Sequence, residues 1–547
     1  MKKIITVIYT LSFVIGAVSA QSVYDGVKIA DKDLNGTARF VGMGGAMGAL
    51  GGDITTMGTN PAGIGIYRSN DVMTSFSYSA YGMESKYEGQ KSTIDKNRWS
   101  FDNIGVVFAT KIGNQTPLRY VNFGFNYKRS KSFYKNMSMS GMMGVVENPS
   151  NPGSPYYVSQ TNSMALQATD AERYVWDNSR QHLDFDNANR IFSDPDAGWL
   201  GALGYQGGLT ERDRIDNEPD LYVPFLPVEP SSVFNSREKG GIDQYDFNVS
   251  FNINDRVYLG LTIGAYDVDY DKYSGYDESY KRGEGYSLES YNNISGSGFD
   301  VKMGLILRPF EYSPFRIGFA VHTFYKLTYS TSAIVTNDYR DAKTDELKRI
   351  IVDTYDYVGD MKRDYRLVTP WKYNVSLGYT VGTSLALGAE YEYEDYSTMK
   401  FKYSSNDGGG DMEFENAEVK NCLKGEHTFR IGAEYKVIPE FAFRLGYNYS
   451  SAVFRDEAVK YIPSNSLITD TDFSNKRSQS NYTLGIGYRG KMFYADLAYQ
   501  LSTYKENFYP FYNEFELTQG EWTMVTPPAT KVTNTRSQVL LTVGMRF

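Results

Sequence analysis

Alternation of apolar and polar residues runs through most of the chain from Asp71 to the C-terminus. In residues 244–253 every second side chain is large and apolar, beginning with Tyr245, Phe247 and Val249, while Gln, Asp, Asn and Ser fill the gaps. Because successive side chains of a strand point to opposite faces, each such run predicts a strand with one apolar face and one polar or glycine face. The same pattern recurs in residues 121–127, 373–379, 441–449 and 493–501.

We count fourteen such runs, many of them 12–16 residues long. Strands of globular proteins usually have about 5–6 residues, whereas a tilted strand needs about 9–11 residues to cross the hydrocarbon layer of a membrane. The runs are therefore long enough to span a bilayer. They begin near Asp71, Trp99, Arg119, Ile242, Arg256, Gly296, Pro314, Arg366, Ser384, Leu423, Glu440, Lys476, Lys491 and Thr535.

The links between the runs alternate in length. Links after the even-numbered runs are short, as at residues 254–255, 438–439 and 489–490, and links after the odd-numbered runs are long. Outer-membrane barrels have short periplasmic turns and long outer loops. Residues 71–547 are thus predicted to form an all-β fold, a transmembrane 14-stranded antiparallel β-barrel with both ends of its wall on the periplasmic side.

The third link, residues 131–241, is much longer than the others. Within it Met164, Ala168, Ala171 and Val175 fall at helical spacing. Long loops with structure of their own are usually functional. We expect a folded outer lid here, and a disordered or adhesive loop is the alternative.

The N-terminus has the features of a secretory signal in residues 1–20. Lys2 and Lys3 precede an apolar run, and the small residues Ser19 and Ala20 suit cleavage before Gln21. No later apolar run approaches the ~20 residues that a membrane helix needs. We therefore expect secretion and residence in a bacterial outer membrane, in contact with its lipid.

A glycine-rich stretch, residues 36–67, precedes the first run and holds ten glycines in thirty-two residues. Glycine costs a helix about 0.5–1 kcal/mol relative to alanine, and the stretch does not alternate as a strand would. It needs surrounding walls to order it, and fourteen strands enclose a lumen too wide for wall side chains to fill. We predict that residues 21–70 form a hatch that plugs the barrel.

Composition excludes several classes of function. The net charge of −9, or −11 without Lys2 and Lys3, argues against a nucleic-acid partner, and the single cysteine, Cys422, cannot form an intramolecular disulfide. The 47 tyrosines and 31 phenylalanines suit a membrane–water boundary.

Catalytic and cofactor signatures are also lacking in the sequence. The three histidines, His182, His322 and His427, lack metal-ligand spacing, and Met47 stands where a dinucleotide fingerprint needs glycine. We expect no enzyme, no cofactor and no metal site, with a wall hydrolase built on His322 as the open alternative.

The polar faces of the runs carry charge that we expect to face the lumen, since a lipid-facing Arg or Lys costs about 2–4 kcal/mol at the membrane midplane. Such residues either form a paired network that braces the barrel or hold a ligand head group or the hatch. The candidates are Lys302, Arg316, Arg430, Arg444, Glu390 and Glu392. The last run ends at Phe547, which shares one face with Met545 and Val543, and this C-terminal aromatic is expected to act as a signal for the barrel-assembly machinery.

The glycine-rich stretch resembles the hatch of the FadL/TodX family of outer-membrane transporters for hydrophobic compounds. The matching motifs are residues 36–39 (Gly-Thr-Ala-Arg), residues 42–46 (Gly-Met-Gly-Gly-Ala), Asp53 and residues 60–63 (Asn-Pro-Ala-Gly). The resemblance implies passive uptake of a hydrophobic small molecule, such as a fatty acid or an aromatic hydrocarbon, through a hatch-gated barrel. The gate residues that it implies are Gly42, Gly44, Gly45, Asp53, Asn60, Pro61, Ala62 and Gly63.

Other functions stay open at this point. A polar-solute porin would not depend on the hatch. A surface adhesin or assembly barrel would use residues 131–241 for protein contact. Some relatives are called haem receptors, although no dedicated His or Tyr motif supports that function here.

Overall fold

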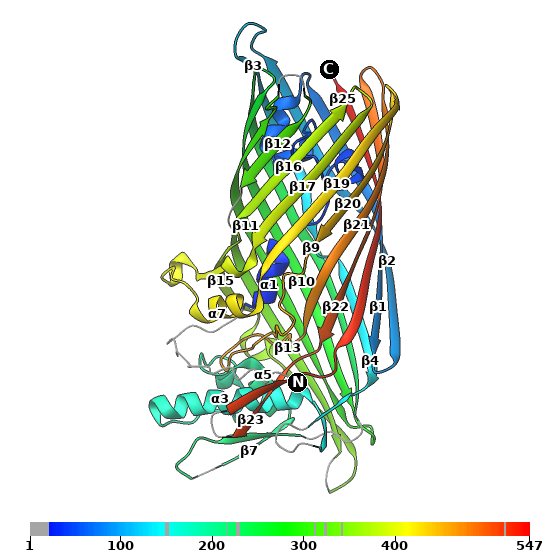
Figure 1. Cartoon of the computed structure of the whole chain (residues 1–547). Coiled ribbons are helices and arrows are strands. Elements are labelled where there is room, and N and C mark those ends of the chain that lie inside the picture. Colours follow the sequence, from blue (N-terminus) through cyan, green and yellow to red (C-terminus); the bar gives the residue numbers. More distant parts are fainter. Residues whose placement is uncertain are drawn as a thin grey trace.

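The computed structural model describes residues 21–147, 153–214, 216–225, 230–310, 313–321, 325–340, 343–518 and 521–547. Its main feature is a closed antiparallel barrel of fourteen wall strands (Figure 1). In ring order the wall consists of β1 (Asp71–Tyr87), β2 (Gln90–Lys111), β3 (Leu118–Ser132), β9 (Ser231–Ile253), β10 (Val257–Ser279), β11 (Gly285–Leu307), β12 (Arg316–Val321) with β13 (Tyr325–Arg340), β16 (Lys372–Val381) with β15 (Met361–Val368), β17 (Leu385–Asp395) with β18 (Lys400–Tyr403), β19 (Gly425–Ile438), β20 (Phe441–Ser450), β21 (Phe473–Arg489), β22 (Phe493–Tyr509) and β25 (Thr530–Arg546).

The ring closes where the first wall strand meets the last. β1 pairs with β25 from Asp71 opposite Arg546 to Lys86 opposite Lys531. An ion pair between Arg546 Nε and Asp71 Oδ2, 3.1 Å apart, joins the two strands at this seam. Closure joins the first and last edges of the sheet, so the predicted fourteen-stranded antiparallel barrel is confirmed.

Three wall strands begin nine or more residues earlier than the alternation predicts. β2 begins at Gln90 and not near Trp99, β9 at Ser231 and not near Ile242, and β11 at Gly285 and not near Gly296. The added parts of β9 and β11 carry polar residues on the outer face, where Arg237 is exposed. The backbone ladder continues there although the apolar alternation has ended, because pairing needs backbone groups and not apolar side chains.

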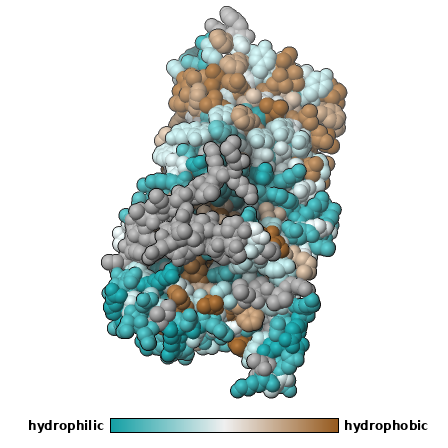
Figure 2. Space-filling model, turned by 60° about the horizontal axis from the view of Figure 1, so that its bottom comes forward, coloured by the Kyte–Doolittle hydropathy of each residue, from teal (hydrophilic) through white to brown (hydrophobic). Residues whose placement is uncertain are grey.

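The outer surface of the wall is apolar toward the end that carries the short links, called the short-link end below. On β20, Phe441, Phe443 and Leu445 are 48%, 53% and 61% exposed, while Ala442 and Arg444 between them are buried. Figure 2 shows hydrophobic residues gathered over the upper part of the molecule, at this end, and hydrophilic ones over the lower part. A wall that meets lipid at one end and water at the other needs this distribution.

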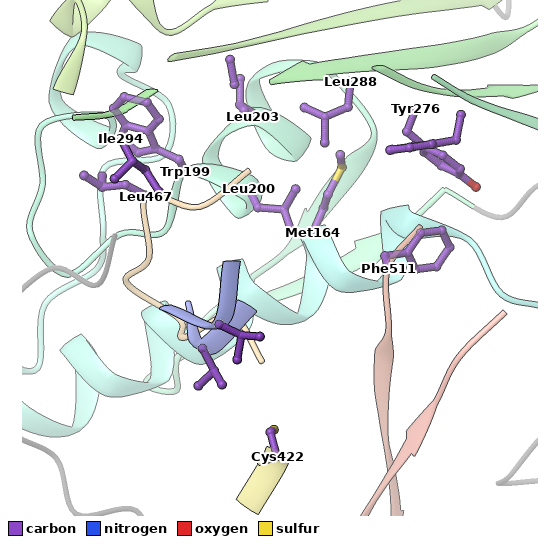
Figure 3. Packing of buried hydrophobic residues seen from close by; sticks show 14 of the residues in the cluster. Met164, Trp199, Leu200, Leu203, Tyr276, Leu288, Ile294, Cys422, Leu467 and Phe511 are labelled. Atoms are coloured by element: carbon purple, nitrogen blue, oxygen red, sulfur yellow. The ribbon is translucent and has the colours of Figure 1, made fainter. Parts of the chain in front are cut away.

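The opposite end, called the loop end below, carries a folded cap whose apolar side chains form one hydrophobic cluster with the wall and α1. In Figure 3, Met164 of α3 packs beside Leu200 and Leu203 of α5, and Trp199 lies on the same core. α3 (Gln160–Ser179) covers the four residues at helical spacing in residues 131–241, and that prediction of a helix is confirmed. Among the described residues, no helix combines the length and apolarity that a membrane span requires.

The remaining elements lie in residues 21–70 and at the loop end. In chain order they are α1 (Val23–Ala30), α2 (Ala38–Gly42), η1 (Ile54–Gly58), η2 (Pro61–Ile66), β4 (Lys135–Met142), β5 (Val145–Glu147), β6 (Pro155–Tyr157), α4 (Ala188–Ile191), α5 (Trp199–Gln206), β7 (Thr210–Asp213), β8 (Leu221–Pro224), β14 (Leu347–Asp353), α6 (Tyr355–Val358), η3 (Tyr396–Thr398), η4 (Ser405–Asp407), α7 (Glu413–Cys422), β23 (Asn513–Thr518) and β24 (Glu521–Val525).

Candidate functional site in the barrel lumen

Residues 21–70, called the N-terminal segment below, lie inside the barrel. α2 contacts β20, β21, β22 and β25 on one side, while η1 and η2 contact β3, β9 and β10 on the other, so the segment reaches across the lumen. Figure 1 shows it in blue within the outline of the barrel. Its elements are short because its glycines disfavour long helices, and contacts with the wall replace the missing local stability.

Glycines on the inner face of the wall let the N-terminal segment approach closely. A Cβ atom added to Gly304 would lie 2.1 Å from Asn60 Oδ1, and one added to Gly432 would lie 2.3 Å from the carbonyl oxygen of Met43. Real Cβ atoms do not come this close to their neighbours. Several wall glycines have such contacts, and we call five of them the glycine belt: Gly260, Gly304, Gly388, Gly432 and Gly446.

Strand register aligns the glycine belt. Gly260 lies opposite Gly304, and Gly388, Gly432 and Gly446 follow one another on β17, β19 and β20. Sequence reasoning missed the belt. In the sequence the belt shows only as glycine on the polar face of several alternating runs. That these glycines align with one another becomes visible only when the strands are paired.

Asn60 holds the turn that ends the N-terminal segment. Its side chain is fully buried; its Nδ2 donates to the carbonyl oxygens of Gly48 and Leu305, at 2.9 and 3.3 Å. Its Oδ1 accepts a hydrogen bond from the backbone N–H of Ala62 at 3.2 Å and thereby caps η2. The carbonyl oxygen of Pro61 accepts from Ser250 Oγ of β9 at 2.8 Å.

Asp53 and Gly63 join parts of the segment to each other. Asp53 Oδ1 accepts from the N–H of Thr55 at 3.0 Å and Oδ2 from the hydroxyl of Thr37 at 2.7 Å. The carbonyl of Gly63 accepts from the N–H of Gly52 at 3.0 Å. These contacts fix the shape of the segment, not its attachment to the wall.

Three glycines of the motif in residues 42–46 lie where the segment passes β20 and β21. Gly44 has φ +62° and its Cα lies so close to β20 that an added Cβ would be 2.8 Å from the backbone nitrogen of Tyr447. Gly45 also has a positive φ, +81°. The carbonyl of Gly42 accepts from Thr483 Oγ1 of β21 at 3.2 Å. Left-handed backbone and close approach both favour glycine, and they explain why glycine occupies these positions.

Arg39 attaches the segment to the wall through charge. Its Nε and Nη2 donate to the two carboxylate oxygens of Glu434 at 2.8 and 3.0 Å, and its Nη1 donates to the carbonyl of Gly52 at 2.8 Å. Glu434 also accepts from Arg444 Nε at 2.7 Å, and Arg444 Nη1 lies 2.6 Å from Asp496. A paired fork of this kind is among the stronger polar contacts in proteins. Arg39 lies in a motif that the sequence singled out, but sequence reasoning did not connect it with Glu434.

The other predicted inward charges also lie on the inner side and are mostly paired. Arg430 bridges Glu390 and Glu392 at 2.5 and 2.8 Å, and the buried Lys302 lies 2.9 Å from Asp246 Oδ1. These pairs agree with a bracing network.

Two of these charges also hold the segment. Glu390 Oε2 accepts from the N–H of Gly48 at 3.0 Å, and Arg316 Nη1 donates to the carbonyl of Leu50 at 2.7 Å. Bracing the wall and holding the segment are therefore not exclusive.

A cavity of about 240 Å³ lies on the loop-end side of the segment, beside α1. Its lining mixes aromatic side chains, such as Tyr24, Phe133 and Phe473, with charged ones. Most of the charged side chains that line it form ion pairs, among them Lys28 with Glu238 and Lys135 with Glu506. The cavity thus offers aromatic surface and many polar atoms at once.

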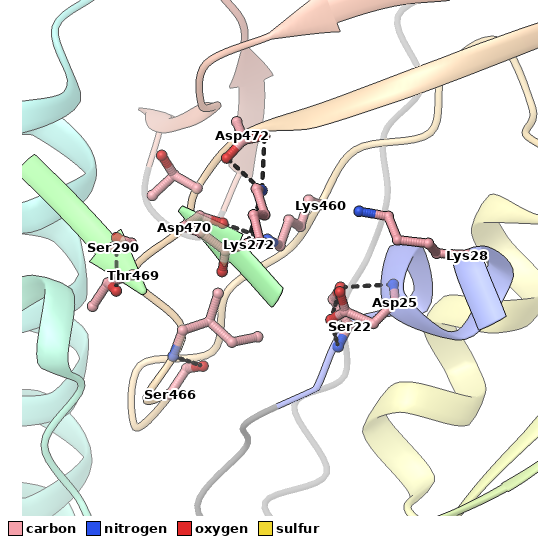
Figure 4. Close-up of polar contacts among 12 residues, drawn as sticks. Ser22, Asp25, Lys28, Lys272, Ser290, Lys460, Ser466, Thr469, Asp470 and Asp472 are labelled. Atoms are coloured by element: carbon pink, nitrogen blue, oxygen red, sulfur yellow. Dashed lines mark hydrogen bonds and ion pairs between the residues drawn. The ribbon is translucent and has the colours of Figure 1, made fainter. Parts of the chain in front are cut away.

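One ion cluster at the rim of this cavity is drawn in Figure 4. Lys272 Nζ lies 3.0 Å from Asp470 and 2.7 Å from Asp472, and Lys460 Nζ lies 3.1 Å from Asp470. Burial alone would raise the pKa of the Asp470 carboxyl, but Lys272 and Lys460 lower that pKa to about 2. The pairs of Lys272, which is on β10, hold the loop between β20 and β21 to the wall, and the Lys460–Asp470 pair joins two parts of that loop.

Phe547 ends the chain next to the start of the wall. Its backbone exchanges hydrogen bonds with Asn70, and its side chain is 57% exposed on the outside. His427 is also on the outside, with Nδ1 2.9 Å from the hydroxyl of Tyr391. Residues 1–20, where the secretory signal is expected, and His322 lie outside the described residues.

Comparison with known proteins finds similarity in structure and not in sequence. No family model and no curated protein matches the sequence. The crystal structure of a Pseudomonas aeruginosa FadL homologue is 12% identical with a TM-score of 0.49, over 94% of this chain and 99% of that chain. The Pseudomonas putida toluene transporter TodX is 10% identical with a TM-score of 0.48, over 94% and 99%. The Ralstonia pickettii toluene transporter TbuX is 12% identical with a TM-score of 0.43, over 94% and 99%. The chain is thus similar in structure to FadL and TodX proteins, the family whose hatch motifs residues 36–63 resemble.

Proposed function

We propose that the protein is a passive transporter of the bacterial outer membrane that takes up hydrophobic small molecules, such as fatty acids or aromatic hydrocarbons. In this proposal the N-terminal segment is the hatch that gates the lumen. No catalytic step and no energy-coupling partner are part of it.

The observation that carries the proposal is the way in which the segment is held. The wall is joined by continuous backbone ladders, whereas the segment is attached by close glycine contacts, apolar packing and separate side-chain contacts, including those of Arg39, Glu390 and Arg316. Each side-chain hydrogen bond contributes only about 0.5–1.5 kcal/mol and none is part of a wall ladder, so contacts of one part of the segment can break while the wall stays intact.

The apolar outer surface supports the location, and the cavity supports the substrate class. The exposed apolar residues near the short-link end fit the outward apolar band of an outer-membrane barrel. Aromatic groups such as Phe133 and Phe473 in the cavity offer a hydrophobic ligand contact area next to paired charges.

A polar-solute pathway is the second candidate, because the same cavity is lined by many ion pairs. A polar compound would find hydrogen-bond partners there without the segment having to move. The two candidates differ in whether movement of the segment is required.

A reversible lock on the segment tests the proposal. Ala49 in the segment faces Gly378 of β16, where an added Cβ would lie 3.3 Å from the Cβ of Ala49. This is close to the usual Cβ separation of about 3.5–4.5 Å in disulfides. The test variant is Ala49→Cys with Gly378→Cys, in a Cys422→Ser background so that no other thiol is present.

Proteoliposomes with the locked variant should take up oleate and toluene slowly when oxidised and at the wild-type rate after reduction. The matched control, Gly378→Cys alone in the same background, should not respond to oxidation. Equal hydrophobic uptake by the oxidised and reduced forms would refute gating by the segment. Flux of glucose in both forms would favour the polar-solute pathway, and no flux of any solute would favour an adhesin.

A further inference from the structure

A cluster of two carboxylates and one histidine lies in the loop-end cap, apart from the lumen site. Glu172 is on α3, His182 follows the end of that helix, and Asp220 directly precedes β8. His182 Nδ1 lies 2.5 Å from Glu172 Oε1 and 3.8 Å from Asp220 Oδ2. One ligand atom from each residue falls within 4.8 Å of the other two.

Each member of the cluster is held in place by its surroundings. The backbone N–H of Leu183 donates to Glu172 Oε2 at 3.0 Å, which leaves Oε1 directed at His182. Arg180, with φ +56°, ends α3 and turns the chain so that His182 folds back toward the helix. The imidazole then packs on the ring of Trp176, with 4.7 Å between ring centroids. Fixed ligand side chains are what a metal site requires.

Burial of the two carboxylates favours positive charge at this place. The side chain of Glu172 is 0% exposed and that of Asp220 is 7% exposed, while that of His182 is 44% exposed. Two buried carboxylates this close together are stable only with positive charge beside them. Arg212 supplies part of it, with Nε 3.7 Å from Asp220 Oδ2. The exposed side of His182 leaves a path from solvent to the cluster.

We propose that Glu172, His182 and Asp220 bind a divalent transition-metal ion of the zinc type. Tetrahedral Zn²⁺, with bonds of about 2.0–2.2 Å to nitrogen and oxygen, places its ligand atoms about 3.3 Å apart. The separations of 2.5 and 3.8 Å from His182 Nδ1 lie on either side of this value, and the third, between the two carboxylates, is within 4.8 Å, so shifts of up to about 1.5 Å complete the geometry.

The imidazole favours zinc over calcium or magnesium, which prefer oxygen ligands alone. His182 binds through Nδ1 and keeps its proton on Nε2. A water molecule takes the fourth position on the exposed side. The bound ion ties the end of α3 to the β7–β8 hairpin.

The competing explanation is an ion pair in which protonated His182 neutralises Glu172 without a metal. Both explanations need the same three residues, so removing a residue and measuring only stability cannot separate them. Direct measurement of bound metal does separate them.

The test uses the full chain in detergent, stripped with a chelator and dialysed against Zn²⁺, with bound zinc measured by elemental analysis. Wild type should bind one zinc per chain, and His182→Ala and Glu172→Gln should bind almost none. His427→Ala is the matched control, because that histidine lies elsewhere on the outer surface, and it should keep one zinc. Co²⁺ in place of Zn²⁺ should give visible absorption bands of a tetrahedral site in wild type only.

The variants should fold, because His182 is half exposed and the amide oxygen introduced by Glu172→Gln can still accept from the N–H of Leu183. Heat-dependent migration in detergent gels checks the folding of each variant, and His182→Asn replaces any His182→Ala that misfolds. Zinc binding by wild type no greater than that of His182→Ala would overturn the proposal and leave an ion pair only. The lumen mechanism is not involved, so failure here leaves the proposed transport function untouched.

Discussion

Replacing Asn60 with alanine separates gating from assembly. The substitution removes the Nδ2 donor from the carbonyls of Gly48 and Leu305 and the Oδ1 acceptor from the N–H of Ala62. Because Asn60 is 0% exposed, no bulk water replaces these partners. The wall is joined by backbone ladders to which this side chain does not contribute, so the barrel should still assemble.

The size of the effect follows from the three hydrogen bonds. A buried hydrogen bond contributes about 0.5–1.5 kcal/mol net, and two of the three are long, at 3.2 and 3.3 Å. We therefore assign about 1.5–3 kcal/mol to the set. Only the bond to Leu305 joins the segment to the wall, and the other two hold the shape of the segment. Since about 1.4 kcal/mol corresponds to a factor of ten, the population of segment that has lost its native shape or position should rise about 10- to 100-fold. Pro61→Ala only frees one backbone φ, worth about 0.4–1 kcal/mol, and should have a smaller effect.

Two measurements on equal amounts of folded protein check this prediction. Uptake of oleate or toluene should change in Asn60→Ala, and single-channel conductance in planar bilayers should show longer open periods. Asn189→Ala, an exposed asparagine of α4, is the matched control and should behave as wild type. Unchanged uptake together with unchanged conductance in Asn60→Ala would refute gating by the segment.

Three further predictions concern assembly, packing and the response to acid. Deletion of Phe547 should reduce membrane-inserted protein, measured by heat-dependent migration in gels, more than Met545→Ala does; equal insertion would make Phe547 an ordinary packing residue. Gly432→Ala should displace the segment and increase conductance, because the new Cβ would lie 2.3 Å from a backbone oxygen, whereas Gly410→Ala, with nothing within 4 Å, should not. The lowered pKa of Asp470, about 2, means that its ion pairs stabilise the fold above pH ~4 and are lost as the pH falls toward 2. Pepsin should therefore cut the loop of residues 451–472 faster at pH 2 than at pH 4, and an equal rate would contradict this assignment.

The sequence by itself determined the class of fold and the number of wall strands. Alternation is a local signal, since each residue's direction on a strand follows from its neighbours, and Phe441, Arg444 and Leu445 therefore took their predicted sides. The starts of β2, β9 and β11 were wrong for the converse reason. Beyond the apolar band the outer faces of those strands are polar and the remaining apolar side chains, such as Leu288 and Ile294 of β11, face inward, so the expected pattern stops while the ladder continues.

The tertiary structure alone decided which distant residues meet. Gly388, Gly432 and Gly446 form a belt only because register places three strands side by side, and no local pattern encodes that register. The same holds for Arg39 and Glu434, which are 395 residues apart in the chain. Their pairing depends on the path of the N-terminal segment across the lumen. That path is set by close packing of the segment against the whole wall.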